Sequence, residues 1–103
     1  PLMPRPRNIL CMMSSGKERA ELESLYDEDE KNASSQTTDV WVAKEAIQKA
    51  AGLGMGLPPQ SFEVYGRNVV NVGIDGVNNI FNLHCWKANL NGQLTSLAIA
   101  EKV

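Results

Sequence analysis

The stretch NLHCWKANLNGQLTSLAIA, residues 82–100, decides the fold that the sequence predicts. Asn91-Gly92 lies between two largely apolar runs, and this dipeptide favours a two-residue hairpin turn with positive φ at both positions. If the strands pair about this turn, Trp86 faces Leu97 across the ladder. In the same register His84 faces Ile99. The opposite side then carries Leu83, Cys85, Ala98 and Ala100, so both faces of the hairpin are largely apolar.

Alternation with period two also precedes this hairpin. Phe62 and Val64 alternate with other residues in one run, and Val70, Val72 and Ile74 form a second. Turn-forming residues separate the runs at 66–68 and 75–79. We therefore expect an antiparallel C-terminal meander of about four strands.

Two helices are expected before the sheet. The segment Ser15-Gly16-Lys17-Glu18 matches a capping box and predicts a surface helix that ends near Asp27. Residues 40–51 repeat apolar side chains every three or four positions, which predicts a buried helix closed by Gly52. Residues 27–38 contain no apolar residue except Ala33, which is typical of a mobile linker.

The N-terminal residues predict an extended arm followed by a strand. Three prolines within residues 1–7 fix φ and remove amide donors, which favours an extended Pro/Arg arm. Five consecutive apolar residues at 9–13 indicate a short strand beginning at Asn8. The predicted fold is therefore α+β, a single domain over residues 8–103 in which this strand and two helices pack on the C-terminal antiparallel sheet.

Composition excludes several classes of function. Ten Lys and Arg stand against twelve Asp and Glu, so the chain lacks the positive field that sequence-independent nucleic-acid binding needs. The apolar run at 9–13 is too short for a signal core or a membrane span. We expect a cytoplasmic protein with no cofactor and no metal. Its two cysteines, Cys11 and Cys85, are expected to be buried thiols rather than a disulfide.

The surplus of apolar surface on the sheet suggests a binding function. A strand that is apolar on both faces must be covered twice, and two helices cover only one face well. The N-terminal arm, the glycine-rich segment 52–57 or another protein chain could supply the second cover. We therefore expect a non-enzymatic protein-interaction or regulatory domain that acts through a face or edge of the C-terminal sheet. It is expected to bind a protein partner or to self-associate, with a homodimer as the expected assembly. Its expected partner-binding residues are Tyr65, Trp86, Leu97 and Ile99.

An alternative hypothesis is a small hydrolase, most plausibly a nuclease. Glu63 would act as base and His84 as acid, with a cation from Arg67 or Lys87 stabilising the phosphorane. This hypothesis requires Glu63 and His84 to open onto one shared cleft. The glycine-rich segment 52–56 follows a helix instead of leading into one, so it predicts a bendable connection and not a phosphate-binding loop.

Overall fold

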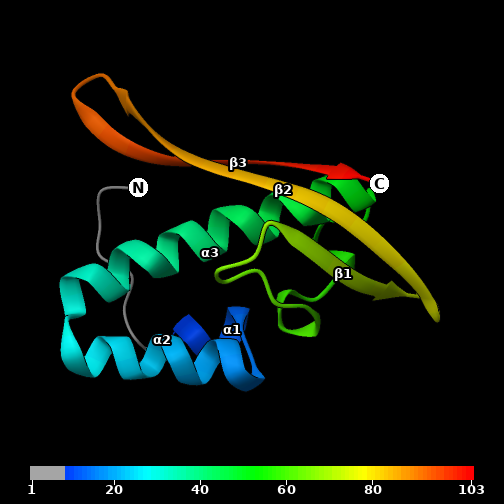
Figure 1. The fold of residues 1–103 in the computed structure, drawn as a ribbon, viewed down its shortest axis with the longest axis horizontal. Helices are drawn as coiled ribbons and strands as arrows, with labels where there is room; N and C mark the ends of the chain where they lie inside the picture. Colours follow the sequence, from blue (N-terminus) through cyan, green and yellow to red (C-terminus); the bar gives the residue numbers. More distant parts are fainter. Residues whose placement is uncertain (1–8) are drawn as a thin grey trace.

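The computed structural model describes residues 9–103 and shows helices packed on one face of an antiparallel sheet (Figure 1). The elements follow in the order α1 (Leu10–Met13), α2 (Gly16–Glu28), α3 (Glu30–Ala51), the short 3-10 turns η2 (Gly54–Gly56) and η3 (Pro59–Ser61), β1 (Val69–Ile74), β2 (Val77–Leu90) and β3 (Gln93–Lys102). The α+β class is confirmed. Within residues 9–103 there are three α-helices and three strands, where two helices and about four C-terminal strands were expected.

The C-terminal hairpin forms in the predicted register. Asn91 and Gly92 have φ values of 53° and 79°, as a two-residue turn with positive φ requires. Trp86 pairs with Leu97, and His84 pairs with Ile99. A second tight turn at residues 75–76 joins β1 to β2, so the sheet has the strand order β1-β2-β3.

The longest helix, α3, begins ten residues before the predicted start at residue 40. The expectation of a mobile linker at residues 27–38 is wrong, because these residues contain the end of α2, a break at Asp29 and the first turns of α3. The Asp29 carboxylate accepts a hydrogen bond from the Asn32 amide at 3.2 Å and so caps α3. Ala33 and Thr37 are buried and continue the inward face of the helix toward Val40, and this burial outweighs the polar local composition.

Two segments predicted as strands are not strands. The chain at Leu10–Met13 is helical, with Leu10 and Met13 fully buried three positions apart on one side of the turn. Residues 62–68 form a loop between η3 and β1, although the side chains of Phe62 and Val64 are buried. Periodicity over so few residues does not distinguish a strand from a buried turn or loop. The expected arm at 1–7 lies outside the described residues.

The main core lies between α3 and the inner face of the sheet, and α2 packs on the other side of α3 (Figure 1). Val70, Val72, Phe81 and Leu83 supply the sheet side of this core. α3 ends as predicted, because Gly52 adopts a left-handed φ of 75° and its amide donates to carbonyls of the last turn. The helix therefore runs between α2 and the sheet and can carry side chains to both.

Candidate functional site

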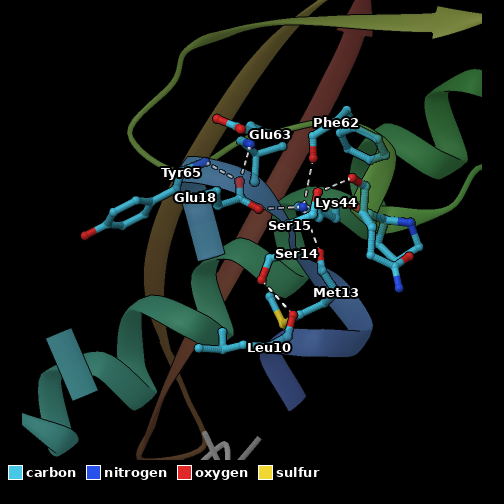
Figure 2. A network of polar contacts seen from close by, with 12 residues as sticks. Leu10, Met13, Ser14, Ser15, Glu18, Lys44, Phe62, Glu63 and Tyr65 are labelled. Carbon is cyan, nitrogen blue, oxygen red and sulfur yellow. Dashed lines mark hydrogen bonds and ion pairs between the residues drawn. The ribbon is translucent and has the colours of Figure 1, made fainter. Parts of the chain in front are cut away.

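A buried ion pair joins α2 to α3 on the side of α3 away from the sheet (Figure 2). The Lys44 ammonium lies 2.5 Å from Oε1 of Glu18, and each of the two residues is only 2% exposed. Removing two charges from water is costly, so such a pair persists only where further hydrogen bonds satisfy both groups. The surroundings of both side chains meet this condition.

The Lys44 ammonium is surrounded by backbone acceptors. It donates to the carbonyl oxygens of Met13 at 2.7 Å, Pro59 at 2.6 Å and Phe62 at 2.8 Å (Figure 2). These carbonyls belong to the end of α1, to η3 and to the loop that follows η3. One side chain of α3 therefore ties together three segments that share no secondary structure.

The Glu18 carboxylate completes this network from α2. Its Oε2 accepts hydrogen bonds from the amides of Val64 at 2.7 Å and Tyr65 at 3.1 Å, while Oε1 faces Lys44. The predicted capping box is wrong, since the Ser15 hydroxyl donates to the Gln60 carbonyl and makes no cap hydrogen bond. A buried ammonium and two amides are stronger partners for a carboxylate than an amide at an exposed helix end. We call this network of Lys44, Glu18 and their backbone partners the lysine clamp.

Burial lowers the pKa of Lys44 from its ordinary value of 10.5, because desolvation penalises the ammonium form. The hydrogen bond and charge of Glu18 act in the opposite direction, and the charge of Glu63 adds a smaller effect of the same sign. The ammonium has four acceptors around it, so the geometry of the clamp suits the charged form.

A groove of about 260 Å³ lies beside the clamp along α3. Its walls are mainly apolar, with Met12 and Trp41 among the lining side chains and Met55 on the segment that follows α3. Glu45 and Lys49 are exposed charged residues that line the same groove. A site of this kind, with apolar walls and a few polar groups, is typical of small-molecule binding.

The helical repeat and the clamp together place the residues of this groove. Trp41, Glu45 and Lys49 are spaced by four and lie along one side of α3. Met13 and Pro59 also line the groove, and their carbonyls accept hydrogen bonds from Lys44. The lysine clamp thus holds part of the groove wall in position.

Three of the four expected partner-binding residues lie together on the outer face of the sheet. Trp86 is 44% exposed and Ile99 is 50% exposed, and Leu97 is half-buried opposite Trp86. Tyr65 lies elsewhere, on the loop beside α2, where its amide binds Glu18. The outer sheet face therefore keeps an apolar patch, made of Trp86, Leu97 and Ile99, that no helix of the described chain covers.

The residues of the nuclease hypothesis are not brought together. Glu63 lines a hollow beside α2, where its carboxylate lies 3.5 Å from Arg67 Nη2. His84 lines a different hollow on the sheet, next to Cys85. Lys87 is tied to α3 through the Asp39 carboxylate at 3.1 Å. The shared cleft that this hypothesis required is therefore not formed by Glu63 and His84.

Cys11 and Cys85 do not form a disulfide with one another. Cys11 and Cys85 are however exposed, so the expectation of buried thiols is wrong. Partial burial raises the pKa of the Cys85 thiol, and the negative charge of Asp39 raises it further. Cys85 therefore resists ionisation at a position that solvent can reach.

Two kinds of feature are absent from residues 9–103. No group of three or more His, Cys, Asp or Glu side chains in this part of the chain could hold a metal ion. None of its helices is long and apolar enough to cross a membrane.

Comparison with known protein families decides the identity that geometry leaves open. Residues 1–100 match the 4'-phosphopantetheinyl transferase superfamily, ACPS. The chain belongs to this superfamily. No curated protein and no solved structure matches the chain. Both functional expectations are therefore wrong, the non-enzymatic interaction or regulatory domain as well as the nuclease.

The sequence contains one indication of the site, a lysine within the apolar pattern of the predicted helix. Lys44 lies four residues after Val40 and three before Ile47, so it occupies the buried face of the predicted helix. A lysine on that face requires an acceptor in the interior. The linear sequence does not identify this acceptor, since Glu18 lies 26 residues away and also fits a capping box.

Proposed function

We propose that this domain transfers 4'-phosphopantetheinyl groups and that the groove beside the lysine clamp binds the donor. The family match over residues 1–100 carries this proposal. The groove supports it by offering mainly apolar walls together with an exposed ammonium and an exposed carboxylate. A coenzyme A molecule would supply the group, since it carries phosphopantetheine on a phosphoanhydride.

The chemistry of the group suits the two kinds of surface in the groove. Phosphopantetheine has a phosphate at one end and a chain with two methyl groups and two amides behind it. The apolar walls around Trp41 and Met55 suit the chain, while the Lys49 ammonium suits the phosphate. In the transfer step an acceptor hydroxyl oxygen attacks phosphorus, and the bond to the nucleotide phosphate breaks with its electron pair. Glu45 is the carboxylate of the groove that would accept the hydroxyl proton.

The role proposed for Lys44 is structural. Its ammonium already has Glu18 and three carbonyl oxygens as acceptors, and it is almost completely buried. Contact with a phosphate would require it to give up these partners. Lys44 therefore supports the groove wall, and Lys49 is the cation that remains exposed to a ligand.

A transfer assay tests this function directly. The protein is incubated with fluorescent coenzyme A, magnesium ions and an acyl carrier protein, and the label on the carrier protein is measured after electrophoresis. We expect transfer by the wild type, and a loss of about 10²-fold or more in Glu45→Gln, as for removal of a general base. Glu30→Gln, an exposed position at the other end of α3, is the matched control. A wild type that neither binds coenzyme A nor transfers the label would contradict the proposal.

We further propose that the outer sheet face binds a second copy of this chain. Trp86, Leu97 and Ile99 supply the apolar patch, and β3 beside it forms an edge of the sheet. Residues 88–100 contain no charged side chain, so an antiparallel edge of this kind can pair with the same edge of another copy. A partner that presents the same neutral apolar surface matches the patch better than a charged one.

Sedimentation analysis over a range of concentrations tests this association. Trp86→Ala should weaken dimerisation by more than about 1 kcal/mol, since aromatic residues at the centre of a patch carry much of the binding energy. Val77→Ala, an exposed apolar position at the other end of β2, is the control. A wild-type protein that stays monomeric at all concentrations would exclude the dimer.

A further inference from the structure

One side chain of α3 holds a segment that forms part of the wall of the groove. Gln48 is almost completely buried, and its amide donates to the Leu57 carbonyl at 2.8 Å. The same nitrogen lies 3.7 Å from the sulfur of Met55. Gln48 therefore contacts both the backbone and a lining side chain of this wall, which we define as residues 53–57.

The wall has little rigidity of its own. Glycines alternate at positions 52, 54 and 56, and Gly54 adopts a left-handed φ of 51°. Only its first residue forms a backbone hydrogen bond to α3, in which the Leu53 amide donates to the Gln48 carbonyl. The next two bonds, from residues 56 and 57, close turns within the wall. Met55 itself is 75% exposed, so packing restrains its side chain weakly.

We infer that Gln48 is a positioning residue that fixes this wall in the conformation that receives the pantetheine chain of the donor. The inference rests on the proposed function and adds to it a residue, Gln48, that sets the affinity for the donor. If the wall is already ordered, binding of the ligand does not carry the entropic cost of ordering a glycine-rich segment. Gln48 also lines the groove, but its amide is already paired with the wall, so it acts through Met55 and Leu57 and takes no part in the transfer of the proton or the phosphoryl group.

The test compares Gln48→Leu with the wild type in binding and in turnover. Leucine retains most of the side-chain volume and removes the amide donor. Loss of a neutral hydrogen bond predicts a Kd and a KM for coenzyme A that are about three- to tenfold higher, with kcat within about twofold of the wild-type value. Gln36→Leu, on the same helix and outside the groove, is the matched control and should change neither constant.

Hydrogen exchange of the protein without ligand gives a readout that does not depend on activity. The amides of residues 56 and 57 should exchange faster in Gln48→Leu, and by more than the loss of overall stability measured by thermal unfolding accounts for. An unchanged Kd and unchanged exchange in Gln48→Leu, with normal binding by the wild type, would overturn the positioning role alone. A loss of kcat that matches the rise in Kd would also overturn it. Failure of the wild type to bind coenzyme A would instead overturn the proposed function on which this inference rests.

Discussion

Replacing Lys44 by methionine should destabilise the fold by about 3–5 kcal/mol, which is the usual cost of removing one partner of a buried ion pair. Methionine fills a similar volume but carries no charge and no donor. The Glu18 carboxylate would lose its countercharge, and the carbonyls of Met13, Pro59 and Phe62 would lose a common donor. Protonation of Glu18 can relieve part of this penalty, which is why the separate contributions do not simply add.

This loss is large for a domain of this size, since total stabilities lie at about 5–15 kcal/mol. It corresponds to a fall of more than about 12 °C in the unfolding midpoint. Urea unfolding followed by tryptophan fluorescence measures the free energy directly through the midpoint concentration and the m-value. Lys49→Met, an exposed position five residues further along α3, should remain within about 0.5 kcal/mol of the wild type.

A double variant separates the pair from its surroundings. Glu18→Gln combined with Lys44→Met should be less destabilising than the sum of the two single changes, because neither buried charge then remains without a partner. If Lys44→Met alone costs less than about 1 kcal/mol, the ion pair does not support the fold and the account of the lysine clamp is refuted.

Three further predictions follow from individual residues. The pKa of Lys44 in the folded protein is lowered, so between that pKa and 10.5 the unfolded chain binds more protons than the folded one. The free energy of unfolding should therefore rise with pH in this range. This rise, measured by urea unfolding, should be smaller in Lys44→Met. Asp39 helps to raise the pKa of Cys85, so Asp39→Asn should accelerate alkylation of Cys85 at a fixed mildly alkaline pH. Mass spectrometry measures the alkylation rate, with Cys11 as the internal reference. An unchanged rate would contradict the electrostatic cause. Gly92 has a φ of 79°, so Gly92→Ala should lower the free energy of unfolding by about 1 kcal/mol through strain in the hairpin turn. Gly76, with a φ of 77°, lies in the other turn, and Gly76→Ala should have a similar effect. If neither substitution changes the stability, the requirement for positive φ is contradicted.

Local chemistry explains the part of the fold that the sequence predicted. The turn at Asn91-Gly92 depends on backbone preferences of two adjacent residues, and it sets the pairing of Trp86 with Leu97. The end of α3 at Gly52 depends in the same way on a residue that tolerates left-handed φ. Such features need no knowledge of distant residues.

Neither the groove nor the function could be predicted from local sequence. Its lining residues come from α1, α3, η2 and η3, and no single segment shows a recognisable chemical motif in its composition alone. Trp86 and Ile99 are exposed on the sheet, but their exposure does not identify a transferase. The match of residues 1–100 to the superfamily is what identifies the family.

The sequence by itself therefore determined the C-terminal hairpin, its register and the end of α3, because each depends on neighbouring residues and on regular spacing. Only the tertiary structure decided that Glu18 turns inward to Lys44, 26 residues along the chain, and that polar residues 30–39 are helical. Both outcomes depend on burial. A buried charge is stable only when distant groups satisfy it, and a polar stretch stays helical when its few inward side chains find a surface to pack against. The linear order of residues specifies neither the groups nor the surface.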